Sequence, residues 1–185
     1  MIRILIADDH PIVRQGFKQV LSETADLVVA DEASDGQEVL ALVARREYDV
    51  ILLDISMPGK NGLEVLKELR IMNPRIPVLI LSIYPEEQYA IRALKAGASG
   101  YLTKASAPEE LISAIRKVSR GGKYISSSLA EKLAYELDGD KEKAPHETLS
   151  DREYQILLMI ASGKTVSDIA DEMCLSVKTV STYRS

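Results

Sequence analysis

The order of hydrophobic and polar positions divides the first 120 residues into five short apolar runs, each followed by a stretch with helical spacing. The apolar runs predict β-strands at residues 2–7, 27–30, 50–54, 77–82 and 100–102. Apolar residues that recur every three or four positions predict helices at about residues 12–21, 39–43, 63–72, 84–96 and 108–119. Strands that alternate with helices in this way form a parallel sheet covered on both faces by right-handed crossovers. The sequence therefore predicts an α/β fold, a five-stranded doubly wound parallel sheet.

A change of pattern after residue 120 ends this domain. Gly121 and Gly122 interrupt the alternation, and one short helix fits residues 126–137. The ten residues after it are mostly charged and include Gly139 and Pro145, a composition typical of a linker. We expect a first domain at residues 1–120, a linker with a short helix at 121–147 and a second domain at 148–185.

The second domain is predicted to be a small all-α unit. Ser150 and Glu153 form an N-terminal capping box ahead of a helix at residues 151–161. Two further helices, at residues 166–173 and from residue 177 onward, are joined by a tight turn and make a helix-turn-helix. One core is predicted for the apolar residues Ile156, Leu157, Ile160, Ile169, Ala170, Met173, Leu175 and Val180.

Composition limits the classes of protein that fit. Hydrophobic residues make up 46% of the chain, enough for a packed core, but none of the apolar runs approaches the ~20 residues that a membrane helix requires. The chain begins directly with a strand and has one cysteine, Cys174, so we expect a cytoplasmic protein without internal disulfides or a structural zinc site. Cys174 itself is expected to be a small core residue. The net charge of −5 gives no sign of nucleic-acid binding by the whole chain, although both charged residues after Cys174, Lys178 and Arg184, are positive.

Polar residues with complementary chemistry stand at the ends of four predicted strands. Asp8 and Asp9 follow the first strand, Asp54 ends the third, Ser82 ends the fourth, and Lys104 follows the fifth. The first and third strands are neighbours in a doubly wound sheet, so the three carboxylates are expected to converge. A hard divalent cation relieves their repulsion, and Mg²⁺, which prefers oxygen ligands, suits such a site best. A metal, an ammonium and a hydroxyl around one carboxylate form a constellation that binds a phosphoryl group.

Three other interpretations fit parts of this pattern. The acids could serve only as turn formers. A nucleotide or flavin site needs a loop rich in glycine or hydroxyl groups after the first strand, whereas the loop from Asp8 to Pro11 repels phosphate. A phosphatase with an aspartate nucleophile usually has a second acid two residues later, where this chain has Ser56. We therefore expect a lasting aspartyl phosphate on Asp54 and interpret His10 as a loop residue near the metal.

Residues 1 to about 119 resemble the receiver domain of bacterial two-component response regulators. The matching motifs are Asp8-Asp9, Asp54 within LLDISMPGKNG, Ser82, and GYLTK with Tyr101 and Lys104. The resemblance implies a flavodoxin-like fold in which Asp54 accepts a phosphoryl group from a sensor histidine kinase and Lys104 holds the phosphoryl oxygens. It also implies that Asp9, Asp54 and the Ser56 carbonyl bind Mg²⁺ directly, with Asp8 acting through water.

Ser82 and Tyr101 are the residues that this resemblance assigns to switching. A phosphoryl group adds up to about two negative charges and about three acceptor oxygens at one point. Ser82 is expected to move to hydrogen-bond this group, and Tyr101 to turn inward into the vacated space. The surface between Tyr84 and Ser119 then changes shape and partner preference.

Residues 149–185 resemble the LuxR-type DNA-binding domain, which follows a receiver in the NarL/FixJ subfamily. The matching signals are Leu149-Ser150 with Glu153, Ala161 with Gly163, Ile169-Ala170, and the run Ser176-Val177-Lys178-Thr179-Val180. By this resemblance, Lys178 and Thr179 are expected to contact DNA phosphates, and Ser181, Thr182 and Ser185 to face base edges. Arg184 lies on the same recognition helix. The family has a fourth helix after this one, so a chain that ends at Ser185 is expected to bind DNA weakly or not at all.

We therefore predict a transcription factor that phosphorylation switches, and no enzyme activity beyond the catalysis of its own phosphorylation and dephosphorylation. Its expected partners are the histidine kinase, double-stranded DNA and, after phosphorylation, a second copy of the chain; no membrane partner is expected. The alternative is a receiver whose output is protein–protein binding, with residues 148–185 serving as a dimerisation or docking module.

Overall fold

The computed structural model describes residues 1–137 and 148–184, which belong to two compact units, Met1–Asp138 and Gly139–Ser185. The charged part of the predicted linker, residues 138–147, lies outside the described residues. In the part of the chain that the structure describes, no helix is long and apolar enough to cross a bilayer.

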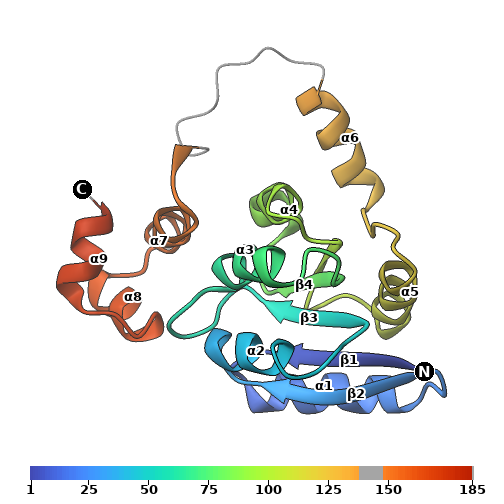
Figure 1. The fold of residues 1–185 in the computed structure, drawn as a ribbon. Helices are drawn as coiled ribbons and strands as arrows, with labels where there is room; N and C mark the ends of the chain where they lie inside the picture. Colours follow the sequence, from blue (N-terminus) through green and yellow to red (C-terminus); the bar gives the residue numbers. More distant parts are fainter. Residues whose placement is uncertain (138–147, 185) are drawn as a thin grey trace. The chain divides into compact units, whose positions relative to one another are not determined.

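The first unit is a five-stranded parallel sheet flanked by helices (Figure 1), which confirms the predicted fold class. Its strands are β1 (Ile2–Ala7), β2 (Leu27–Ala33), β3 (Val50–Asp54), β4 (Val78–Ser82) and β5 (Gly100–Thr103), in the order β2-β1-β3-β4-β5. Its helices are α1 (Pro11–Ser22), α2 (Gly36–Val43), α3 (Gly62–Met72), α4 (Glu86–Lys95), α5 (Pro108–Ser119) and α6 (Ser127–Leu137).

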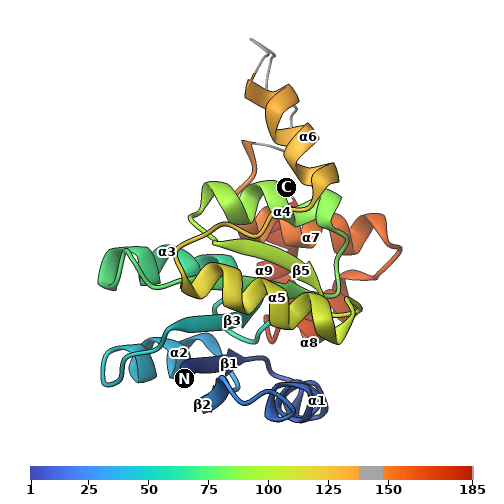
Figure 2. The ribbon, with the colours of Figure 1, turned by 90° about the vertical axis from the view of Figure 1, so that its right-hand side faces the viewer.

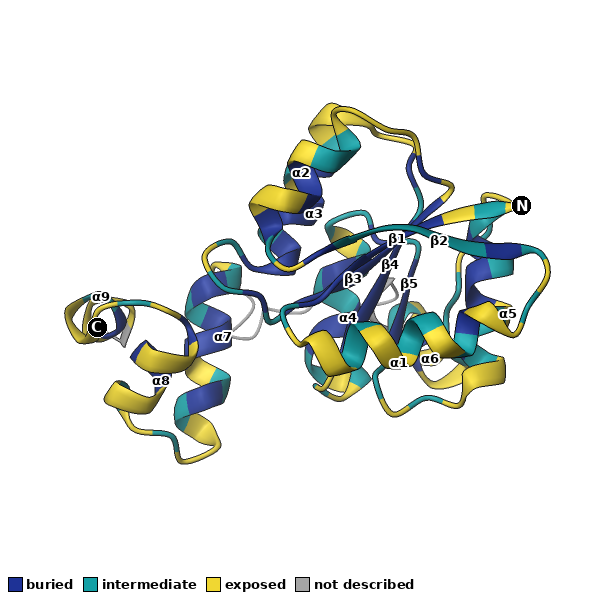
Figure 3. Cartoon of the chain, turned by 90° about the horizontal axis from the view of Figure 1, so that it is seen from below, coloured by how far each residue is buried: buried dark blue, intermediate teal, exposed yellow. Residues whose placement is uncertain are grey.

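The core lies on both faces of the three central strands. All five residues of β3 and all five of β4 are buried, because each strand has strand neighbours on both sides and helices above and below (Figure 3). On one face, side chains of α1 and α5 pack against the sheet, because Leu21, Leu111 and Ile115 belong to one apolar cluster with residues of the strands. Figure 2 shows the course of these two helices. The central strands therefore hold their carboxyl ends in a fixed register.

A tight loop holds the end of β3 in place. Gly62 begins α3, and its backbone N–H donates to the carbonyl of Ile55 at 2.9 Å. A Cβ atom on residue 62 would lie 2.0 Å from the carbonyl oxygen of Asp54, so this close approach requires glycine. Asn61 and Glu64 cap the same helix reciprocally, which fixes its first turn beside Asp54.

Among the element boundaries that differ from the prediction by up to three residues, two have identifiable reasons. Strand β2 continues three residues further, to Ala33, because the charged residues Asp31 and Glu32 find partners on this edge strand. Arg46 contacts Asp31 at 2.7 Å, and Lys18 contacts Glu32 at 2.6 Å. Helix α4 begins at Glu86 instead of Tyr84, since Pro85 is its N-cap residue, and this leaves Tyr84 in the loop after β4.

The predicted linker helix is part of the first unit. Helix α6 contacts α4, and Leu129 on α6 is only 1% exposed. Before this helix, Tyr124 pairs with Gly100 through an isolated parallel bridge, and Lys123 Nζ donates to the Ala98 carbonyl at 2.6 Å. The chain from Lys123 to α6 therefore continues along the edge of the sheet at β5.

The second unit contains the three predicted helices, α7 (Asp151–Ala161), α8 (Val166–Glu172) and α9 (Val177–Arg184). The predicted capping box is present, since Ser150 Oγ accepts from the Glu153 N–H and the Glu153 carboxylate accepts from the Ser150 N–H. The buried residues of the core are Ile156, Met159, Ile169, Ala170, Met173 and Val180.

Two predictions about this core are wrong. Leu157 is 41% exposed, because the helix turns its side chain away and Met159 fills the core instead. Cys174 is exposed as well, because it lies in the turn between α8 and α9 with a φ of 53°. A residue in this left-handed conformation ends α8 and does not point into the core.

Candidate functional site

The acidic residues of two neighbouring strands meet at the carboxyl edge of the sheet. Asp8 and Asp9 follow β1, Asp54 ends β3, and the two strands are paired in parallel. Asp8, Asp9, His10 and Asp54 each offer one ligand atom, and these atoms all lie within 4.8 Å of one another. The predicted convergence of the three carboxylates is therefore confirmed.

Lys104 places a single ammonium group among these acids. It follows β5, and its backbone N–H donates to the Ser82 carbonyl at 2.8 Å, which anchors the loop to the end of β4. Its Nζ donates to Asp54 Oδ2 at 2.7 Å and forms an ion pair with Asp8 Oδ2 at 2.6 Å. The lysine therefore links the ends of β1, β3 and β5, although these strands are not all neighbours.

Burial raises the free energy of the ionised side chains in this cluster. Asp8 and Asp54 are each 1% exposed. Burial raises the pKa of Asp54, and the negative charge of Asp8 adds to this effect, while Lys104 opposes it. Burial also lowers the pKa of Lys104, but the attraction of Asp54 and Asp8 outweighs it and leaves the pKa raised. Three carboxylates thus share one ammonium group, so Lys104 alone does not balance the acids of this cluster.

Several buried oxygen atoms at this edge have no hydrogen-bond partner among the described residues. Within the described residues, Asp54 Oδ1 and Ser56 Oγ are buried and have no hydrogen-bond partner. Asp9 Oδ1 is buried too, and its near neighbour is His10 Nδ1 at 2.7 Å. Oxygen ligands together with excess negative charge are what a hard divalent cation requires. The cluster therefore fits a metal ion.

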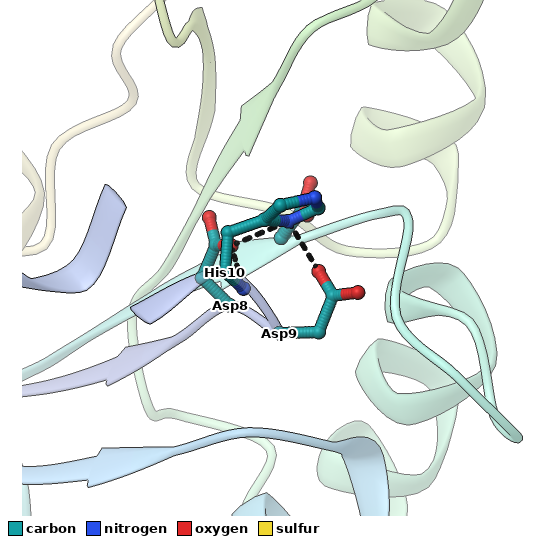
Figure 4. A group of neighbouring side chains, drawn as sticks. Asp8, Asp9 and His10 are labelled. Carbon is teal, nitrogen blue, oxygen red and sulfur yellow. Dashed lines mark hydrogen bonds and ion pairs between the residues drawn. The ribbon is translucent and has the colours of Figure 1, made fainter. Parts of the chain in front are cut away.

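His10 lies on the solvent-exposed side of the acidic cluster, in the loop after β1, as predicted. It is the N-cap residue of α1, and its backbone N–H donates to Asp8 Oδ1 at 2.9 Å. The imidazole points toward Asp9 and Asp8 (Figure 4) and has a mostly exposed side chain. This position leaves it in contact with solvent and with the acids at once.

Ser82 and Tyr101 interact through their side chains, and both also bind the main chain of Tyr84, a residue to which the sequence analysis gave no role. Ser82 is fully buried, and its hydroxyl accepts from the Tyr84 backbone N–H at 3.1 Å. The hydroxyl of Tyr101 donates to the Tyr84 carbonyl at 2.8 Å. Tyr101 is 2% exposed, so its ring is turned inward while Ser82 still holds Tyr84; the inward position therefore does not require the movement of Ser82 that the sequence led us to expect. Burial raises the pKa of the Tyr101 hydroxyl. Tyr84 acts here through its main chain, which leaves no signature in the sequence.

The predicted DNA-binding residues whose side chains the structure describes lie on α9. Lys178, Ser181 and Thr182 are exposed, and Lys178 has no ion pair with any residue that the structure describes. Thr179 N–H donates to Ser176 Oγ at 3.0 Å and so caps the helix. Thr182 Oγ1 donates to the Lys178 carbonyl at 3.0 Å, within the same helix.

Arg184 and Ser185, the last two residues of this predicted set, are described only in part or not at all. The side chain of Arg184 and the whole of Ser185 lie outside the described residues. The described surface of α9 carries one positive charge and several hydroxyl groups, with no acidic residue in its first turn.

Comparison with known families decides what this arrangement belongs to. Residues 4–116 match the model of the response regulator receiver domain. Residues 147–185 match the model of the bacterial regulatory proteins of the luxR family. The chain belongs to the response regulator family. Its receiver and LuxR-type DNA-binding domain make it a two-component response regulator of the NarL/FixJ type that acts in transcription regulation. The alternative, a receiver with purely protein–protein output, is not favoured.

Curated response regulators resemble the chain over its whole length. Response regulator GacA of Pseudomonas aeruginosa is 40% identical over 185 residues, which are all of this chain and 86% of that protein. Response regulator UvrY of Escherichia coli K12 is 38% identical over all of this chain and 85% of its own length.

Solved structures of this family share the fold. A LuxR-family two-component response regulator from Aurantimonas superposes with a TM-score of 0.69 and 33% identity, over 75% of this chain and 99% of that one. RcsB of Salmonella enterica, bound to the promoter P1flhDC in the presence of the phosphomimetic BeF₃⁻, gives a TM-score of 0.66 and 27% identity. That match covers 98% of this chain and 87% of RcsB.

The buried charge predicts how Asp54 affects the stability of this response regulator. Because its pKa is raised in the folded state, ionised Asp54 lowers the free energy of unfolding at neutral pH. Below the unfolded pKa of about 4 the carboxyl is protonated in both states and has no such effect. Asp54→Asn is therefore expected to raise the free energy of unfolding at neutral pH, and by a smaller amount as the pH falls toward 4.

Urea denaturation in a metal chelator, repeated across this pH range, measures the effect. Asp26→Asn is the matched control and is expected to lower the free energy of unfolding at neutral pH. The hydrogen bond from Arg116 holds the pKa of exposed Asp26 below its usual value, so ionised Asp26 stabilises the fold. A loss of stability in Asp54→Asn at neutral pH would contradict the expected cost of the buried charge.

Proposed function

We propose that Asp54 accepts a phosphoryl group from a sensor histidine kinase in a reaction that needs Mg²⁺, and that the phosphorylated receiver switches DNA binding by α9. The observation that supports this most directly is the position of Lys104, whose ammonium contacts Asp54 and Asp8 together at a buried edge that also holds Asp9. A cation fixed beside an acceptor carboxylate attracts the phosphoryl oxygens while the bond forms.

The proposed step exchanges one bond to phosphorus for another. A carboxylate oxygen of Asp54 attacks the phosphorus of the kinase phosphohistidine, the P–N bond breaks, and the histidine nitrogen leaves with the electron pair and takes up a proton. Lys104, already 2.7 Å from Asp54 Oδ2, then transfers its hydrogen bond to a phosphoryl oxygen. The protein thus modifies itself, and no separate substrate is turned over.

Asp8, Asp9, Asp54 and Ser56 are the residues proposed to hold Mg²⁺. The unsatisfied Asp54 Oδ1 and the excess negative charge of the cluster support this assignment. The ion would supply charge neutralisation for the acids and for the phosphoryl oxygens. The chain's part is to hold its carboxylates close together before any phosphoryl donor arrives.

Ser82 and Tyr101 are proposed to carry the signal from this site. A phosphoryl group on Asp54 offers new acceptor oxygens to the Ser82 hydroxyl, which now accepts from the Tyr84 N–H. A Ser82 hydroxyl drawn to the phosphoryl group releases Tyr84, whose carbonyl holds Tyr101. The two residues therefore respond together.

The output is proposed to be duplex DNA bound by α9, with Lys178, Thr179, Ser181, Thr182, Arg184 and Ser185 as the contacting residues. Exposed Lys178 and the hydroxyl groups around it suit contacts with phosphates and base edges. RcsB, a relative of similar fold, has been solved as dimers on DNA. We extend this to phosphorylation-dependent homodimers of the present chain.

Intact mass tests the phosphoryl acceptor. Incubation with a small phosphodonor and Mg²⁺ is expected to add one phosphoryl group to the wild-type chain and none to Asp54→Asn, because the amide is not a nucleophile. Asp49→Asn, which removes an exposed carboxylate elsewhere in the receiver, is the control and should be modified like the wild type. A lasting mass gain in Asp54→Asn, or its absence in the wild type, would contradict the proposal.

DNA affinity at several salt concentrations tests the output surface. In a chain extended by the fourth helix of the LuxR-type domain, Lys178→Ala is expected to weaken the binding of duplex DNA after phosphorylation. It should also reduce the slope of log affinity against log salt by about 1, because one phosphate contact is lost. Lys164→Ala is the matched control, since Lys164 is already paired with Glu172. Equal affinities and slopes for Lys178→Ala and the wild type would exclude α9 from the DNA contact.

A further inference from the structure

Helix α6 is fastened to the first turn of α4 at one point by a shared hydroxyl group. Ser126 Oγ donates to Glu86 Oε2 at 2.7 Å and accepts from the Leu129 backbone N–H at 3.0 Å. The same serine therefore caps α6 and ties it to α4. Loss of this contact would alter the start of one helix and its attachment to the other together.

Two further contacts support this attachment. Lys132 Nζ lies 3.4 Å from Glu87 Oε1, one residue further along α4. Leu129, between the two polar contacts in sequence, is 1% exposed and lies on α6, which contacts α4. An exposed ion pair alone contributes little, so the buried leucine and the Ser126 contact carry most of the attachment.

The anchoring acids of α4 lie directly beyond the residues that respond to Asp54. Ser82 holds the Tyr84 N–H, and the Tyr84 carbonyl holds Tyr101. Only Pro85, the N-cap of α4, separates Tyr84 from Glu86. A displacement of Tyr84 is therefore passed through two covalently linked residues to the carboxylate that binds Ser126.

We infer that docking of α6 on α4 opposes phosphorylation of Asp54, and that a phosphoryl group on Asp54 releases α6 by displacing Glu86 and Glu87 from Ser126 and Lys132. This inference rests on the proposed function of Asp54. It assigns regulation of that site to residues 126–132, and it makes the α4 surface beneath Leu129 a reversible docking surface for this segment of the same chain. The coupling is reciprocal, so weaker docking must strengthen binding of a phosphoryl analogue by the same factor.

A pair of charge variants separates docking from general effects on α6. Ser126→Asp keeps an N-cap residue but places a carboxylate against Glu86, whereas Ser127→Asp adds the same charge one residue later, on an exposed position. Ser126→Asp is expected to tighten the binding of beryllofluoride in the presence of Mg²⁺ at least about fivefold. Ser127→Asp should bind it like the wild type, and Glu86→Lys combined with Ser126→Asp should restore the wild-type affinity by pairing the two charges.

Amide hydrogen exchange of residues 127–133 in the full chain gives an independent readout. Beryllofluoride with Mg²⁺ is expected to speed exchange there in the wild type and to leave it unchanged in Asp54→Asn. Equal beryllofluoride affinities for Ser126→Asp and Ser127→Asp, or no change in α6 exchange while the wild type binds beryllofluoride, would overturn the coupling alone. A wild-type chain that binds no beryllofluoride and takes no phosphoryl group would instead overturn the proposed function.

Discussion

The arrangement depends on the burial of like charges at one edge of a parallel sheet. Parallel pairing brings the carboxyl ends of β1 and β3 side by side, and so forces Asp8, Asp9 and Asp54 together. Lys104 compensates one charge and leaves the rest. A site with this excess charge is poised for a cation, and the fully buried strands around it keep the acids from moving apart.

The same edge connects the charge cluster to the surface. Lys104 is anchored to the Ser82 carbonyl, and the Ser82 hydroxyl holds Tyr84. Tyr84 in turn leads through Pro85 into α4, on which α6 is docked. Because each contact in this series uses a different atom of the same few residues, a change at Asp54 has a short route to the segment that precedes the second unit.

The fold and the positions of the site residues could be predicted because both depend on residue identity. Buried strands show as apolar runs, and Asp54 and Lys104 are recognisable at their ends. Contacts made by main-chain atoms could not be predicted, which is why Tyr84 was missed. Leu157 and Cys174 were misplaced because their exposure is set by helix rotation and by one left-handed turn, which hydrophobicity does not encode. The docking of α6 depends on Ser126 and Glu86, which are ordinary surface residues in the sequence.

The most direct test of the central claim is the pKa of the Asp54 carboxyl, followed by carbon NMR through a pH titration with and without Mg²⁺. Without the metal, the account predicts a pKa above the ordinary value for aspartate, because burial and Asp8 disfavour the ionised form more than Lys104 favours it. With Mg²⁺ the pKa should fall, since the cation stabilises the carboxylate. An ordinary pKa that Mg²⁺ does not move would show that the acids neither repel one another nor share an ion, and would contradict the account.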